Sequence, residues 1–172
     1  MKNFILRLLL LLFIVPFSCT KENKNVITNS SISASHPLAS QAGKKMYEQN
    51  GNAFDAAVAA GFTLAVVEPS MSGIGGRLQA IYRNSSGKIG GVDASTQVPM
   101  NYKKMNKKYS YGYETIGIPG VVAGLLKLHE SYGSLSLKKV MAPAIEFAEK
   151  GFKILPLESE RQKSVKKYLL EF

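Results

Sequence analysis

The first recurring pattern after the N-terminal segment is a set of apolar positions spaced four apart, which predicts an amphipathic helix. These positions are Leu38, Ala42 and Met46. We expect Ser35 to cap this helix at its N-terminus, with Pro37 in the first turn, where the missing N–H needs no partner. The dipeptide Asn50-Gly51 should end the helix, because both residues tolerate a left-handed backbone.

A second helix is predicted over residues 53–67, and small side chains distinguish it. Asn52 is placed to cap it, and Glu68-Pro69 should stop it, since a residue before proline avoids the helical conformation. Its small residues are Ala53, Ala56, Ala57, Ala60 and Gly61. Because small side chains let another element approach closely, we expect this helix to be buried against a sheet or another helix.

Residues 78–83 and 88–92 contain β-branched and aromatic side chains on either side of the turn-forming segment 84–87. This arrangement predicts a β-hairpin. Residues 70–76, which precede it, contain no helical or strand pattern and are expected to form a loop.

Two further helices are predicted, the first from Pro119 to Gly133 and the second over residues 137–150. The last stretch, 158–172, also has a helical pattern and ends on apolar residues. The order is therefore helix, helix, hairpin, helix, helix, which indicates the α+β class. No change in composition divides residues 34–172 into two domains.

The N-terminal segment is typical of an export signal. Lys2 and Arg7 supply positive charge, and the apolar run 8–17 is ten residues long, well short of the roughly 20 that a membrane-spanning helix needs. We therefore expect residues 1–18 to be a signal peptide that is removed on export.

Cys19 follows this apolar run directly, at the place of the cysteine in a bacterial lipobox. We expect lipid to be attached there, with residues 19–33 as a polar tether and the protein anchored to a membrane in the periplasm or at the cell surface. Pro16 departs from the lipobox, which usually has an aliphatic residue at that position. An unmodified cysteine in an ordinary signal sequence is the alternative. A single cysteine excludes an internal disulfide.

The chain carries a formal charge of +10, from 22 Lys and Arg against 12 Asp and Glu. Two clusters hold much of the basic charge: Lys103, Lys104, Lys107, Lys108 and Arg161, Lys163, Lys166, Lys167. Neither lies in a recognisable nucleic-acid motif. We interpret both as solvated faces and expect no nucleic-acid partner.

The glycine cluster over residues 72–76 contains Gly73, Gly75 and Gly76. It is not a dinucleotide fingerprint, because the third required glycine falls at Leu78 and the predicted order is helix then strand. The chain also lacks a P-loop sequence. Unobstructed N–H groups would let this loop approach a ligand or another segment, although a plain structural turn explains the glycines equally well.

Metal or cofactor binding is not indicated by the sequence. His36 and His129 are far apart, and no carboxylates are grouped at ligand spacing. His36 is expected to help fix the helix start, and Asp55 to interact with the dipole of its helix. We expect neither a metal nor a cofactor.

Six blocks of sequence resemble the γ-glutamyltranspeptidases, in the order in which that family has them. They are residues 35–43, 51–60, 67–69, 72–76, 118–124 and 142–152. The resemblance implies an N-terminal-nucleophile hydrolase with an αββα sandwich, of which residues 34–172 would form only the N-terminal part. It implies a precursor that cuts itself into large and small subunits and exposes a threonine amine. That threonine is the nucleophile for γ-glutamyl amides such as glutathione.

Two substrate-site residues depart from the family pattern. Typical transpeptidases have an arginine four residues before the proline of the segment 93–99, where this chain has Ser95. A serine cannot form the bidentate ion pair with a substrate carboxylate. We expect Arg77, beside the glycine cluster, to supply the missing charge, although a surface position for Arg77 or a substrate that is not a γ-glutamyl compound would also fit.

The nucleophile itself is expected outside this chain. The family's threonine begins the small subunit, and Thr63, Thr96 and Thr115 lie in unsuitable places. We therefore expect this chain to need the remaining, small-subunit portion of the enzyme as its partner and to be inactive alone. The alternative is a non-catalytic exported lipoprotein or decayed gene product, with a binding role or none.

Overall fold

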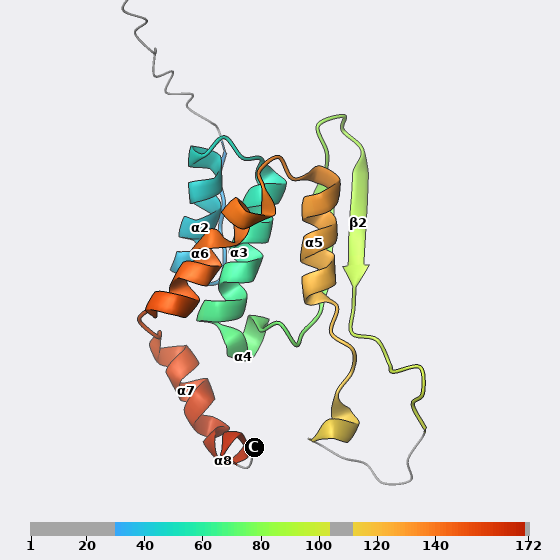
Figure 1. The fold of residues 1–172 in the computed structure, drawn as a ribbon, viewed down its shortest axis with the longest axis vertical. Coiled ribbons are helices and arrows are strands. Elements are labelled where there is room, and N and C mark those ends of the chain that lie inside the picture. The colour runs from blue at the N-terminus through green and yellow to red at the C-terminus, as the bar shows by residue number, and fades with distance from the viewer. Residues whose placement is uncertain (1–29, 104–111, 171–172) are drawn as a thin grey trace, which may run out of the picture.

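The computed structural model describes residues 30–103 and 112–170 (Figure 1). The predicted signal peptide, Cys19 and most of the tether lie outside the described residues, as do Lys104, Lys107 and Lys108. Within the two described ranges, no helix has the length and apolar character needed to cross a membrane.

Helix α2 (Pro37–Glu48) begins with its proline in the first turn, as predicted, but its cap is His36. The backbone of His36 is extended, and its Nδ1 accepts a hydrogen bond from the Leu38 N–H at 3.1 Å. The prediction that Ser35 caps the helix was wrong, because its hydroxyl donates instead to Glu68 Oε2 at 2.7 Å. The predicted part of His36 in fixing this helix start is confirmed.

Helix α3 (Ala53–Val67) follows a left-handed Asn50 (φ 62°), which ends α2 as expected. The predicted cap of α3 is confirmed: Asn52 Oδ1 accepts from the N–H groups of Phe54 and Asp55. In return, the Asp55 carboxylate accepts from the Asn52 N–H at 2.8 Å. Three otherwise unpaired N–H donors at the helix start are thereby satisfied by the two side chains.

Helix α3 is the centre of the helical part and packs against both α2 and α6 (Leu137–Lys150). A Cβ at Gly43 of α2 would lie 3.0 Å from the carbonyl oxygen of Ala56, so the two helices approach closely. The predicted burial of α3 is confirmed for the face that carries Ala56, whereas Ala53 and Ala57 are exposed.

Strands β1 (Leu78–Arg83) and β2 (Ile89–Ala94) form the predicted hairpin. They are antiparallel, with Leu78 opposite Ala94 and Arg83 opposite Ile89. The second strand begins one residue later and ends two residues later than the sequence indicated. The turn includes Gly87 at φ 83°, a conformation that side chains disfavour.

Helix α5 (Val121–Tyr132) lies between α3 and the hairpin, so helices cover one face of the sheet (Figure 1). A Cβ at Gly124 would lie 2.6 Å from Cδ2 of Leu78 and 2.7 Å from Cβ of Ala94. The absence of a side chain at Gly124 is what allows α5 to lie this close to the strands.

The core lies where α2, α3, α5 and α6 meet. Its buried apolar residues are Met46, Ala56, Val58, Ala59, Phe62, Val121, Leu125, Leu128, Val140 and Ala144. The helices around one hairpin give the α+β arrangement that the element order indicated.

Several short elements differ from the predictions. A four-residue helix, α4 (Pro69–Ser72), occupies the start of the expected loop, and a 3-10 turn lies at Tyr113–Thr115. The helix expected over 158–172 is two helices, α7 (Pro156–Ser164) and α8 (Lys166–Leu169). The helix expected from Pro119 begins at Val121 instead.

Candidate functional site

A cavity of about 590 Å³ lies beside the glycine loop, which we define as Gly73–Gly76, between α4 and β1. Helices α3 and α5 contribute an apolar wall. The polar lining comes from the loop side and from the segment after β2. Leu64, Val121 and Leu125 line the apolar wall, and Ser72, Arg77 and Thr96 line the polar side. The cavity therefore combines an apolar wall with a polar, cationic edge.

The start of α5 closes one side of this cavity. The carbonyl oxygen of Gly76 accepts hydrogen bonds from the N–H groups of Gly120, at 3.1 Å, and Val121, at 3.3 Å. A Cβ at Gly120 would lie 2.1 Å from the carbonyl oxygen of Ala94. Gly120 thus permits a backbone-to-backbone contact between α5 and the hairpin, a role that the residue's place in a sequence block did not reveal.

The three glycines of the loop differ in what they permit. A Cβ at Gly73 would lie 2.7 Å from the carbonyl oxygen of Pro69, and one at Gly76 would lie 3.3 Å from that of Gly73. A Cβ at Gly75 would meet nothing within 4 Å. None of the three has a positive φ. Gly73 therefore allows the close approach of the loop to the Pro69 carbonyl oxygen, whereas Gly75 faces open space.

Arg77 and Ser95 flank the same end of the hairpin. Arg77 directly precedes β1 and Ser95 directly follows β2, and the adjacent residues Leu78 and Ala94 are paired. Arg77 is exposed and lines the cavity. The structure thus brings the two predicted substrate-site residues to one end of the sheet, with Arg77 on the cavity.

Ser95 is engaged in a local turn. Its hydroxyl donates to Asp93 Oδ1 at 2.5 Å, and its N–H donates to the same oxygen at 3.1 Å. The Ser95 hydroxyl, followed by the Gln79 amide and the Ser95 N–H, holds the pKa of the Asp93 carboxyl below its usual value. Thr96, the next residue, is the one that lines the cavity. The family pattern points to Ser95, the position of the family's arginine, and gives no signal for Thr96 beside it.

Asp55 is fully buried and does not line the cavity. It connects the start of α3 to the segment after α5. It accepts hydrogen bonds from the Ser134 hydroxyl at 2.6 Å, from the Ser134 N–H at 3.1 Å and from the Leu135 N–H at 3.2 Å, besides the cap bond from Asn52. Burial by itself raises the pKa of Asp55. The hydrogen bonds, with that of the Ser134 hydroxyl first among them, outweigh burial and leave the pKa below its usual value. His129 Nε2 lies 3.9 Å from Asp55 Oδ1 and 2.9 Å from the carbonyl oxygen of Leu135.

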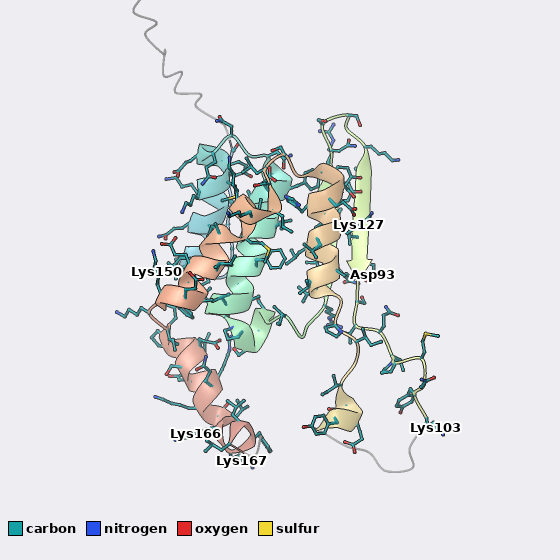
Figure 2. The ribbon with its side chains drawn as sticks, viewed as in Figure 1. Asp93, Lys103, Lys127, Lys150, Lys166 and Lys167 are labelled. Atoms are coloured by element: carbon teal, nitrogen blue, oxygen red, sulfur yellow. The ribbon has the colours of Figure 1, made fainter. Side chains whose placement is uncertain are left out.

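The part of the chain that the structure describes contains no group of three or more His, Cys, Asp or Glu side chains that could hold a metal ion. Basic side chains are spread over it: Figure 2 shows Lys103 far from Lys166 and Lys167, with Lys127 and Lys150 on other elements. These labelled lysines do not gather into one patch.

The fold is that of an N-terminal-nucleophile hydrolase. In a crystal structure of the γ-glutamyltranspeptidase of Helicobacter pylori, the matching part is 35% identical with a TM-score of 0.77, and covers 85% of this chain and 46% of that chain. The helices and hairpin described above therefore correspond to one part of the sandwich, as the sequence predicted.

The family described as gamma-glutamyltranspeptidase matches residues 39–171, and the chain belongs to this family. It is 37% identical over 124 residues to the capsule biosynthesis protein CapD proenzyme of Bacillus anthracis, covering 72% of this chain and 22% of that protein. It is 32% identical over 149 residues to the glutathione hydrolase proenzyme of Bacillus subtilis (strain 168), covering 80% of this chain and 25% of that protein. The chain thus spans about a quarter of the length of these relatives.

Proposed function

We propose that this chain forms part of the acyl-substrate pocket of a γ-glutamyl-transferring or hydrolysing enzyme, with Arg77 holding a carboxylate of the substrate. The observation that supports this is the cavity beside the glycine loop, among whose lining residues in the described ranges Arg77 alone is charged. A guanidinium binds a carboxylate through two parallel hydrogen bonds. Arg77 would thereby replace the family arginine whose position Ser95 occupies.

Replacement of Arg77 tests this proposal in a complete enzyme that contains this chain. Arg77→Ala should raise KM for γ-glutamyl substrates about tenfold or more, because a charge-assisted hydrogen bond contributes roughly 1.5–3 kcal/mol. Arg83→Ala is the matched control, since Arg83 ends β1 at the opposite end of the hairpin. An unchanged KM in Arg77→Ala, or an equal rise in both variants, would exclude Arg77 from this role.

The reaction that we propose is acyl transfer through a threonine outside this chain. The threonine hydroxyl attacks the γ-glutamyl amide of glutathione or a related compound, and its own amine takes the proton and passes it to the amide nitrogen, which leaves as an amine when the C–N bond breaks. Water or an acceptor amine then resolves the acyl-enzyme and releases the threonine hydroxyl. Both relatives are named as proenzymes, which is consistent with a precursor that is cut. The partner of this chain would be the small-subunit portion of the same enzyme.

The location of the nucleophile has a direct test. The purified chain should hydrolyse no γ-glutamyl anilide, and the coding sequence downstream of residue 172 should continue into a segment with the nucleophilic threonine. Turnover by the pure chain would contradict the proposal. A downstream sequence without such a threonine would favour the non-catalytic lipoprotein instead.

We also propose export and lipid anchoring through Cys19, on the grounds of the apolar run that precedes it. Cells that express the chain with radiolabelled fatty acid should label it, and Cys19→Ser should abolish the label and release the protein from the membrane fraction. Equal labelling of both forms would contradict anchoring at this residue.

A further inference from the structure

Helix α7 is attached to the rest of the molecule by polar contacts. Its one buried residue is Glu158, which is 3% exposed. The apolar neighbour Leu157 is 56% exposed and Leu155 is 37% exposed. Burying a carboxylate is costly unless it accepts hydrogen bonds or faces a cation. The partners of Glu158 therefore determine where α7 lies.

These partners connect α7 to α4, the short helix that leads into the glycine loop. Glu158 accepts hydrogen bonds from the Ser70 hydroxyl of α4 and, at 2.8 Å, from Gln162 of α7 itself. One turn further along α7, Arg161 Nη1 lies 3.2 Å from Glu68 Oε1, at the start of α4. Both ends of this contact are partly buried, with 31% of the Arg161 side chain and 16% of the Glu68 side chain exposed.

Helix α4 follows directly on α3 and contacts it, and Glu68 also accepts a hydrogen bond from the Ser35 hydroxyl, so the contacts from α7 add to these supports. It contains four residues, none of them buried, and its largest apolar side chain, Met71, is 65% exposed. So short a helix is not stable by itself. A hollow of about 250 Å³ is lined by residues of α4 and of the glycine loop.

The glycine loop is bonded to α4 at its start and, through the carbonyl oxygen of Gly76, to the N–H groups of Gly120 and Val121 at its end. The Gly73 N–H donates to the carbonyl oxygen of Pro69 at 3.2 Å, and the Gly76 N–H donates to that of Gly73 at 3.2 Å. Arg77 follows immediately. A displacement of α4 would therefore be transmitted through two successive backbone hydrogen bonds to the cation at the edge of the cavity.

We propose that Glu158 and Arg161 are positioning residues: through Ser70 and Glu68 they brace α4, and so fix the glycine loop and Arg77. Figure 1 shows α7 extending away from the helical part, below α6, so its attachment is separate from the core. That the positioned loop serves a carboxylate substrate rests on the proposed function; that α7 positions the loop does not.

The test compares Glu158→Gln with Glu160→Gln in the full chain, because Glu160 lies on the same helix and is exposed. Amide hydrogen exchange is measured by NMR. In Glu158→Gln the protection of Gly73 and Gly76 should fall about tenfold or more while that of α3 stays unchanged, since local opening is separate from global unfolding. Glu160→Gln should resemble the wild type. Unchanged loop protection in Glu158→Gln, or an equal loss in the loop and α3, would overturn the proposal.

A double-mutant cycle shows whether the effect passes through Ser70. Ser70→Ala and Glu158→Gln should each reduce loop protection, and the double variant should lose less than the sum of the two, because both act on the same contact. Arg161→Gln should produce a smaller loss in the same amides. Additive losses in the double variant would show that Glu158 acts by another route and would contradict the brace.

L-glutamate, titrated into the same samples, separates this inference from the proposed function. Weaker binding in both Arg77→Ala and Glu158→Gln supports the two together. If Arg77→Ala leaves the binding of L-glutamate unchanged, Arg77 does not have the proposed role. A loss of loop protection in Glu158→Gln would still support the brace. Unchanged loop protection in Glu158→Gln, together with weaker L-glutamate binding in Arg77→Ala, would support the proposed role of Arg77 and contradict the brace.

Discussion

Asp55 is the residue whose replacement should cost this fold most. It is fully buried and accepts hydrogen bonds from Asn52, Ser134 and Leu135. Asp55→Asn replaces one acceptor oxygen by a donor that faces other donors. We expect the free energy of unfolding to fall by about 3 kcal/mol, since unpaired buried groups cost roughly 1–3 kcal/mol each.

Urea unfolding of this variant is the measurement, and Asp93→Asn is its control. Asp93 is an exposed aspartate that accepts from the Ser95 hydroxyl, so its replacement should leave the midpoint nearly unchanged. Equal midpoints for Asp55→Asn and the wild type would show that the buried carboxylate does not hold the start of α3 in place.

Acid should weaken the protein through the same carboxylate and through Glu158. Burial raises the pKa of both groups, but their hydrogen bonds outweigh it, so each pKa lies below its usual value. A lowered pKa stabilises the folded state above the unfolded-state pKa, roughly 3.9 for Asp and 4.3 for Glu, and this stabilisation is lost as pH falls through the folded-state value. Thermal unfolding should therefore show a steep loss of Tm below about pH 4 that is reduced in Asp55→Asn. An unchanged slope in that variant would contradict the prediction.

Caps show how far single residues could be predicted. The cap at Asn52 was correctly predicted, because an asparagine directly before an apolar helix readily accepts hydrogen bonds from the first N–H groups of that helix. Ser35 was not, since the sequence could not show that Glu68, 33 residues away, would take its hydroxyl. Local chemistry can be predicted from a sequence, and competition from a distant residue cannot.

Among the elements, the contact between α5 and the hairpin leaves the least room for an added side chain. Gly120→Ala would place a Cβ 2.1 Å from the Ala94 carbonyl oxygen, a backbone atom that cannot turn aside. We expect a loss of about 2 kcal/mol in the free energy of unfolding, within the roughly 1–3 kcal/mol typical of overpacking. Urea unfolding measures it.

Gly75→Ala is the control for this substitution. It makes the same chemical change in open space and at a φ that alanine accepts, so its unfolding midpoint should match that of the wild type. Gly120→Ala and Gly75→Ala with equal stabilities would mean that α5 can withdraw from the strands without cost.

Long elements followed from their patterns, and short ones did not. The residues 137–150 were predicted to the residue, because an apolar face and a closing glycine specify a helix locally. Helix α4 was expected to be a loop, since four residues contain no full period. The break between α7 and α8 at Val165 likewise lacks a glycine or proline to announce it.

At the scale of the whole molecule, the outer face of the hairpin exposes two isoleucines among the polar side chains of Gln79, Arg83 and Asp93. Ile81 is 88% exposed and Ile89 is 71% exposed, on the face away from α5. Exposed apolar strands favour association between copies. We expect Ile81→Thr combined with Ile89→Thr to raise the solubility of the chain and leave its Tm nearly unchanged.

Light scattering at increasing concentration is the measurement for this double variant. Val122→Thr together with Leu126→Thr, at partly exposed positions of α5, is the matched control and should leave association unchanged. An equal gain in solubility from both double variants would show that the sheet face is not the associating surface.

The candidate site could be predicted only in part, for a reason that concerns the whole fold. The sequence blocks specified the family, and Arg77 was expected to supply the charge missing at Ser95; the structure brings both residues to one end of the hairpin. The cavity itself is made by α3, α5 and the segment at Thr96, which are separated along the chain. Their approach depends on Gly120 and on tertiary packing, which no local pattern encodes.

The hydrogen bonds of Asp55 have a consequence for the order in which the chain can fold during synthesis. Ser134 lies 79 residues after Asp55, so a nascent chain that has produced α2, α3 and the hairpin still lacks the Ser134 and Leu135 donors for this carboxylate. Translation completes the start of α3 only when the turn between α5 and α6 has emerged. We therefore expect the start of α3 to gain its last hydrogen bonds late in synthesis.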